Sequence, residues 1–217
     1  MYNKILIVSG GSIEDAFATK WMEAYAPEYM IVADSGMEFM RRIGKLPDMI
    51  IGDFDSVEQQ TLAFFKAQPA ILFKELNPIK DDTDTEFAIH QAIALGAKEI
   101  TVLGGTGSRL DHVLGNIALL GIGLKEQVAI QIIDAHNRIR MIEKPIRIRK
   151  EEQFGSYVSL IPYNGEVSHL FLKGFKYPLE DFVLKPFNSL GISNEIVEDT
   201  AEISFEEGIL LVIEAKD

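Results

Sequence analysis

The chain has 217 residues, of which 47% are hydrophobic and 25% are charged, a composition typical of a globular protein with one large domain or two modest ones. Its 33 acidic and 21 basic residues give a net charge of −12, which argues against nonspecific nucleic-acid binding, because such binding needs a basic surface. The chain contains no cysteine, which excludes disulfides and thiolate zinc sites. The apolar start is too short for a membrane span and lacks a cleavage pattern, so we expect a cytoplasmic protein that binds neither membranes nor nucleic acids.

The first two-thirds of the chain alternates between short apolar runs and segments with helical periodicity. We expect buried strands at residues 4–8, 29–33, 49–51, 70–73, 99–103 and 128–134. The helices expected between them cover residues 13–25, a short segment ending at 43, and residues 57–67, 83–95 and 110–124. Ser12 is the expected N-cap of the first helix, and Asp82 or Thr83 that of the fourth. This alternation predicts a parallel sheet with helices on both faces.

The pattern changes after about Arg138. Period-two segments follow at residues 146–149, 157–161, 167–172, 182–184, 202–205 and 209–213, and turn residues at 163–166 and 206–208 separate some of them. The prediction is therefore an α/β protein. An N-terminal three-layer parallel-sheet domain covers residues 1–140, and a C-terminal antiparallel β-sandwich or barrel covers residues 141–217.

Acidic residues follow the expected strands at their carboxyl ends, where open parallel sheets bind ligands. The edge collects Asp34, Asp53, Asp55, Asp81, Asp82, Asp84 and Asp111, together with the bases Lys80 and Arg109. Any one of these aspartates could serve only as a helix cap or turn residue. As a group they repel one another unless a cation neutralises them, and carboxylates suit Mg²⁺. The group therefore favours a magnesium site.

The segment Leu103-Gly104-Gly105-Thr106-Gly107 joins an expected strand to an expected helix. Its amide groups could approach phosphates at the positive end of that helix, and Arg109 could add a bidentate clamp. It is not a P-loop, because GxxxxGK[ST] is absent. Together with the acidic edge it indicates a Mg²⁺-dependent enzyme that transfers a phosphoryl-type group from a nucleotide.

Two other functions remain open at this point. A glycosyltransferase also uses an Asp-x-Asp pair such as Asp53 and Asp55 to hold a metal and a nucleotide diphosphate. A non-enzymatic nucleotide-sensing module with a β interaction domain would need the same phosphate-binding features without turnover.

The ordered motifs resemble those of the thiamine pyrophosphokinase family, in its bacterial form. They are Ala33-Asp34-Ser35-Gly36, Gly52-Asp53-Phe54-Asp55-Ser56, Lys80-Asp81-Asp82-Thr83-Asp84, the run from Gly104 to His112, and Ser193-Asn194-Glu195. The resemblance implies transfer of the pyrophosphoryl group of the co-substrate ATP to the hydroxyl of thiamine, with release of AMP. It also implies an α/β catalytic domain, a β-rich thiamine-binding domain, and a homodimer in which one subunit's catalytic edge meets the partner's β domain at thiamine.

The resemblance also suggests a role for each matching residue. The metal ligands would be Asp53, Asp55 and Asp81. Catalytic roles would fall to Asp55, Asp81, Asp84 and Asp111. The residues implied to contact ATP or thiamine are Asp34, Ser35, Gly36, Lys80, Thr83, Gly105, Thr106, Gly107, Arg109, Ser193 and Asn194. Animal members stack a C-terminal tryptophan on thiamine, whereas this chain has no tryptophan after Trp21.

Overall fold

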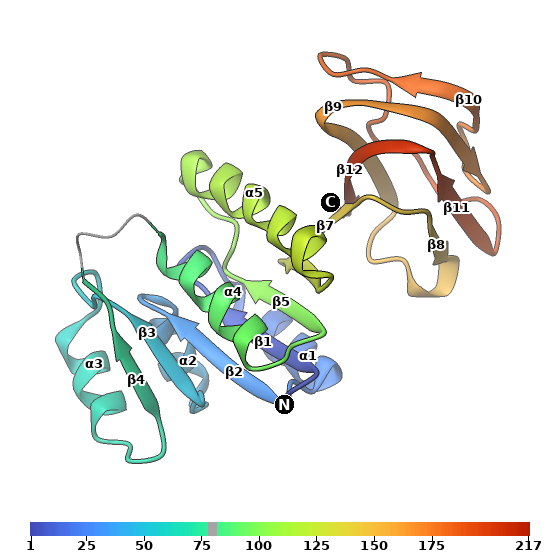
Figure 1. Ribbon diagram of the computed structural model, residues 1–217. Coiled ribbons are helices and arrows are strands. Elements are labelled where there is room, and N and C mark those ends of the chain that lie inside the picture. Colours follow the sequence, from blue (N-terminus) through green and yellow to red (C-terminus); the bar gives the residue numbers. More distant parts are fainter. Residues whose placement is uncertain (78–81) are drawn as a thin grey trace. The chain divides into compact units, whose positions relative to one another are not determined.

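The computed structural model describes residues 1–77 and 82–217, and the chain divides into two compact units, Met1–Ala135 and His136–Asp217 (Figure 1). The division differs from the domain boundary expected at residue 140. Residue 140 falls inside strand β7 (Asn137–Ile142), which the sequence analysis left unassigned and which pairs within the second unit.

The first unit contains a parallel sheet, as predicted. Its strands run in the order β4-β3-β2-β1-β5-β6 and every neighbouring pair is parallel. They are β1 (Lys4–Val8), β2 (Tyr29–Ala33), β3 (Met49–Gly52), β4 (Leu72–Glu75), β5 (Glu99–Leu103) and β6 (Ala129–Ile133). The apolar residues of β1 and β3 are buried, as expected for strands covered on both faces.

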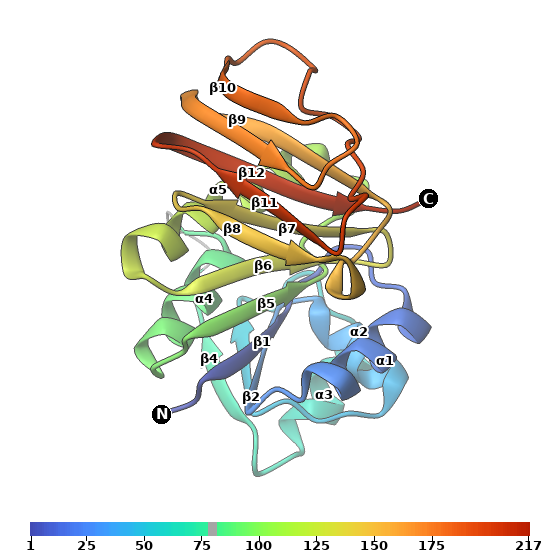
Figure 2. The same ribbon diagram turned by 90° about the vertical axis from the view of Figure 1, so that its right-hand side faces the viewer.

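Helices cover both faces of this sheet. They are α1 (Asp15–Tyr25), α2 (Gly36–Ile43), α3 (Gln59–Lys66), α4 (Asp84–Ala94) and α5 (Leu110–Glu126). Helices α4 and α5 lie on one face and α1 and α2 on the other (Figure 2). The described residues include no helix whose length and hydropathy would let it cross a membrane.

The two predicted N-caps have different outcomes. Ser12 does not cap α1, whose N-cap position is Glu14. The backbone N–H of Ser12 instead donates to the carbonyl of Thr106 at 2.7 Å, which holds Ser12 in a loop before the helix. Of the two alternatives for α4, Asp82 and Thr83, the cap is Thr83, because its hydroxyl oxygen accepts a hydrogen bond from the backbone N–H of Glu86 at 3.2 Å.

The second unit is built from antiparallel strands, in agreement with the predicted fold class. They are β7, β8 (Ile146–Arg149), β9 (Tyr157–Lys173), β10 (Leu179–Leu184), β11 (Thr200–Ser204) and β12 (Glu207–Ala215). Their order is β7-β12-β9-β11-β8, and β10 pairs with the second half of β9. Their inward side chains form one core, which includes Leu160, Leu170 and Val212.

The turn predicted at residues 163–166 is wrong, because this segment lies inside the continuous strand β9. Asn164 and Gly165 have φ angles of 59° and 139°, and the pairing of β9 with β12 shifts register at this point. These turn-forming residues therefore make a bulge that bends one strand instead of reversing the chain. The first half of β9 pairs with β12, and its second half pairs with β11 and β10.

Candidate active site

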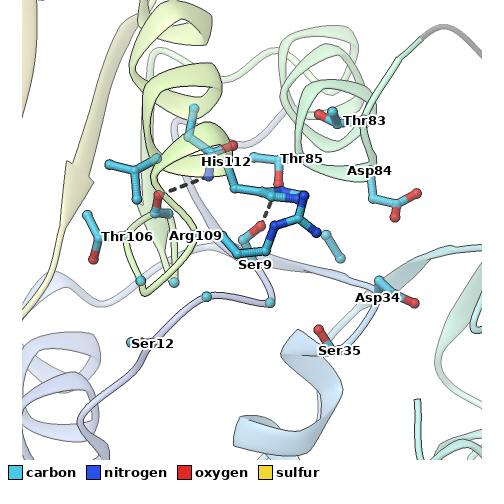
Figure 3. Close-up of a pocket in the computed structure, with 18 of the residues that line it drawn as sticks. Ser9, Ser12, Asp34, Ser35, Thr83, Asp84, Thr85, Thr106, Arg109 and His112 are labelled. Carbon is cyan, nitrogen blue, oxygen red and sulfur yellow. Dashed lines mark hydrogen bonds between the residues drawn. The ribbon is translucent and has the colours of Figure 1, made fainter. Parts of the chain in front are cut away.

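A cavity of about 440 Å³ lies in the first unit, at the carboxyl ends of its parallel strands (Figure 3). Four loops contribute its wall: residues 9–12 after β1, Asp34 and Ser35 after β2, residues 83–85 at the start of α4, and residues 104–109 between β5 and α5. Segments far apart in sequence meet here because the carboxyl ends of parallel strands share one edge of the sheet.

Three carboxylates meet at this edge. Asp34, Asp53 and Asp55 each offer one oxygen atom, and these atoms lie within 4.8 Å of one another. The turn after β3 is held by a hydrogen bond of 3.2 Å from the backbone N–H of Asp55 to Oδ1 of Asp53, and Ser56 Oγ donates to Asp55 Oδ1 at 2.8 Å. Hard oxygen donors at this spacing are the ligand set that Mg²⁺ prefers.

Asp34 and Asp53 are half-buried and Asp55 is exposed, and the environment of Asp34 favours a cation most clearly. Burial raises the pKa of the Asp34 carboxyl above the ordinary value, and the nearby carboxylates of Asp84 and Asp53 add to this shift. The Oδ1 atom of Asp34 is buried and has no hydrogen-bond partner among the described residues. A buried carboxylate oxygen without a donor is costly, and a bound cation would satisfy it.

Other parts of the cavity wall favour anions. Ser35, Thr83 and Arg109 occupy the N-cap positions of α2, α4 and α5, and all three line the cavity, so the positive ends of three helix dipoles lie at its wall. Gly104 has φ +70°, and a Cβ there would lie 2.3 Å from the carbonyl oxygen of Ser9, so only glycine allows this close approach of the two loops.

Arg109 and Asp111 form an exposed bidentate ion pair at the start of α5. The two contacts are Arg109 Nε to Asp111 Oδ1 at 3.2 Å and Nη2 to Oδ2 at 2.6 Å. The hydrogen bonds from Arg109 hold the pKa of Asp111 at about 2. The ion pair holds these two exposed side chains together at the start of α5.

Hydroxyl groups form part of the cavity floor. Ser9 at the end of β1 and Thr85 in the first turn of α4 share a buried hydrogen bond between their hydroxyl oxygens, drawn as a dashed line in Figure 3. Asp84 lines the cavity beside them. Thr106 on the opposite loop donates its hydroxyl proton to Asp134 Oδ2 at 2.7 Å, at the end of β6.

Ser193 and Asn194 lie in the second unit and play different structural parts. Asn194 is buried, and its side chain is committed to the backbone of Tyr177: Oδ1 accepts from the N–H at 3.0 Å and Nδ2 donates to the carbonyl at 2.8 Å. Ser193 is exposed, with φ +57°. Asn194 therefore positions the segment, whereas Ser193 presents its hydroxyl to solvent.

Two family models match the chain. The model of the thiamin pyrophosphokinase catalytic domain matches residues 22–132, and that of the thiamin pyrophosphokinase vitamin B1 binding domain matches residues 143–210. The chain belongs to the thiamine pyrophosphokinase family. The glycosyltransferase and nucleotide-sensor alternatives receive no support from these comparisons.

Relatives from two bacteria agree with this assignment. A thiamine pyrophosphokinase of Bacillus subtilis is 36% identical over 188 residues, 86% of this chain and 87% of its own length. The crystal structure of thiamine pyrophosphokinase from Bacillus subtilis matches at TM-score 0.89 and 35% identity, over 99% of this chain and 100% of the other. The crystal structure of thiamin pyrophosphokinase from Geobacillus thermodenitrificans matches at TM-score 0.85 and 31% identity, over 99% of this chain and 98% of the other.

The motifs of the thiamine pyrophosphokinase family are distributed unevenly over the site. The cavity wall includes Asp34, Ser35, Thr83, Asp84, Gly105, Thr106, Gly107 and Arg109. Asp53 and Asp55 join the site through the carboxylate cluster, Gly36 begins α2, and Asp111 reaches it through Arg109. Lys80 and Asp81 lie outside the described residues. Asp34, expected at the acidic edge and among the residues that contact ATP or thiamine, is the third carboxylate of the described cluster.

Sequence reasoning missed several residues of the cavity. They are Ser12, Ser56, Thr85, His112 and Asn116. His112, the last residue of the motif run that begins at Gly104, also lines the cavity. Asn116 follows Arg109 by seven residues, two helical turns, and this spacing could have placed it on the same face of α5.

Proposed function

We propose that the cavity of the first unit binds ATP and a divalent cation for the reaction of the thiamine pyrophosphokinase family. In that reaction the hydroxyl oxygen of thiamine attacks the β-phosphorus of ATP, the bond from that phosphorus to the α,β-bridging oxygen breaks, and AMP leaves. One observation carries the proposal: Asp34, a member of the carboxylate cluster, and the N-cap residues of three helices line a single cavity.

We propose that Asp34, Asp53 and Asp55 hold Mg²⁺. The fit rests on their oxygen spacing and on the buried Oδ1 of Asp34 that lacks a partner among the described residues. Bound there, the ion would neutralise charge on the phosphates. Asp81 stays a proposed ligand on the family resemblance, and Asp55 and Asp81 keep their proposed catalytic roles on the same ground.

The phosphates would lie along the part of the cavity wall formed by residues 104–109. The amides of Gly105, Thr106 and Gly107 and the guanidinium of Arg109 supply donors there, and the N-terminus of α5 adds a favourable dipole. Lys80 remains a proposed phosphate contact from its motif. Asp111 would orient Arg109 through their ion pair.

We propose that the carboxylate of Asp84 accepts the proton of the thiamine hydroxyl. It lines the cavity at the start of α4 and stands outside the cluster of three carboxylates. On the second unit, Ser193 would contact thiamine and Asn194 would hold that segment in place through Tyr177. We further propose a cytoplasmic homodimer, which light scattering on the purified protein would test.

The direct test is incubation with ATP, MgCl₂ and thiamine, followed by chromatography for AMP and thiamine diphosphate. The wild-type protein should release both in equal amounts. Asp53→Asn and Asp55→Asn should abolish AMP release while their circular dichroism spectra match wild type. Glu143→Gln, which removes an exposed carboxylate in the turn after β7, is the control and should keep full activity. Normal turnover in both aspartate variants would contradict the cation assignment.

A further inference from the structure

The carbonyl groups of the loop Gly104–Gly107, here called the glycine loop, are held by hydrogen bonds from other segments of the chain. Three successive carbonyls of this loop each accept a hydrogen bond from a neighbouring segment. The bonds are Gly11 N–H to Gly104 O at 2.9 Å, Asn116 Nδ2 to Gly105 O at 2.9 Å, and Ser12 N–H to Thr106 O at 2.7 Å.

These bonds fix the direction of the loop's amides. In a trans peptide the C=O of one residue and the N–H of the next point in opposite directions, because the unit is planar. Holding the three carbonyls therefore also sets the N–H groups of Gly105, Thr106 and Gly107. Those three amides have no hydrogen-bond acceptor in the described parts of the chain, and all three residues line the cavity. Successive free amides in one loop form an anion-binding concavity.

Asn116 is the side-chain member of the three anchors. The other two are backbone amides of the loop after β1, which only a proline substitution would remove, and proline would also restrict the backbone of that loop. Asn116 lies on α5 and bonds the middle carbonyl, so its loss would free the peptide between Gly105 and Thr106 to rotate. Rotation of that peptide would turn a carbonyl oxygen toward the position of an anion and withdraw an N–H from it.

We infer that Asn116 is a positioning residue for the phosphates of the nucleotide. It acts through the Gly105 carbonyl, which it holds so that the glycine loop presents donors and not acceptors. The inference rests on the proposed function, since it takes the triphosphate to bind at this loop. It assigns Asn116 no contact with the nucleoside.

Isothermal titration calorimetry of two probes in MgCl₂ tests this role: ADP, which is not turned over, and inorganic tripolyphosphate. Asn116→Ala should weaken the binding of both by the same factor, about 10- to 100-fold, as expected for one hydrogen bond to a charged group. The KM for ATP should rise by a similar factor, with kcat and the KM for thiamine nearly unchanged. Asn116→Leu serves as the second variant if the alanine protein unfolds.

Gln131→Ala is the matched control. It also removes one side-chain amide donor, which bonds Thr101 Oγ1 at 2.9 Å on the sheet away from the cavity wall, so phosphate binding should stay at the wild-type level. Unchanged tripolyphosphate affinity in folded Asn116→Ala would overturn the inference, whether or not ADP binding falls. That result leaves the proposed function standing if wild type still binds tripolyphosphate, whereas a wild-type protein that binds neither probe would overturn both.

Discussion

Neutralising one carboxylate of the Asp34–Asp53–Asp55 cluster should stabilise the metal-free protein while removing its response to magnesium. Asp55 is the exposed member, so Asp55→Asn changes charge without opening a core cavity. Asparagine keeps an acceptor for the hydroxyl of Ser56, which bonds Oδ1 of Asp55 at 2.8 Å. The substitution therefore tests the repulsion between the carboxylates with little other change.

The size of the effect follows from the spacing. Like charges at the 4.8 Å limit of this cluster repel by about 1 kcal/mol each when water screens them. With two neighbours, Asp55→Asn should raise the stability of the metal-free protein by about 1–2 kcal/mol. For a chain of this length, that corresponds to a rise in Tm of about 2–8 °C.

Differential scanning calorimetry in low salt measures both halves of this prediction. In EDTA the variant should melt above wild type. On adding MgCl₂ the wild-type Tm should rise, because bound magnesium stabilises the fold by about 2.7 kcal/mol when its concentration is a hundred times the Kd. The Tm of the variant should stay nearly constant. Glu143→Gln should match wild type in both buffers. A variant that melts below wild type in EDTA, or whose Tm rises as much as that of wild type on adding magnesium, would refute the electrostatic reasoning.

Three further predictions concern stability and pH. Glu214 is fully buried, and its carboxylate accepts hydrogen bonds from the guanidinium groups of Arg140, at 2.6 Å, and Arg138. Glu214→Gln should therefore lower the free energy of unfolding of the second unit in urea by about 3–5 kcal/mol. A loss below about 1 kcal/mol would contradict this. Thr83→Ala should cost about 1 kcal/mol through loss of the α4 cap, and Thr83→Ser should restore it. The hydrogen bond with Asp181 raises the pKa of His169, so this pairing stabilises the fold below the ordinary histidine pKa and is lost as pH rises through the raised value. NMR titration should return the His169 pKa toward its ordinary value in Asp181→Asn, and an unchanged midpoint would exclude the pairing.

Local patterns in the sequence were enough for the fold class and the family. Buried strands and amphipathic helices have different periods, and their alternation specifies a parallel sheet whatever the details of packing. The motifs at the carboxyl ends of the strands needed no coordinates, because topology alone brings those ends to one edge. A cap of α4 at Asp82 or Thr83 was also predictable, since the hydrogen bond that Thr83 makes spans only three residues.

Local signals failed where a long-range contact competed with them. Ser12 is a good N-cap residue, but its amide is bonded to Thr106 and the helix begins later. Asn164 and Gly165 form a favourable turn pair. They stay within one strand because the part of β9 before them pairs with β12 and the part after them pairs with β11.

The site divides in the same way. Sequence by itself determined which residue types gather at the edge, because strand order and loop position depend on local periodicity. Only the tertiary structure decided what each side chain does there: Asp34 completes a cluster with Asp53 and Asp55, Asp111 is held by Arg109, and Asn116 anchors the glycine loop. Distances of a few ångströms between residues far apart in sequence depend on how the elements pack, and no local pattern encodes them.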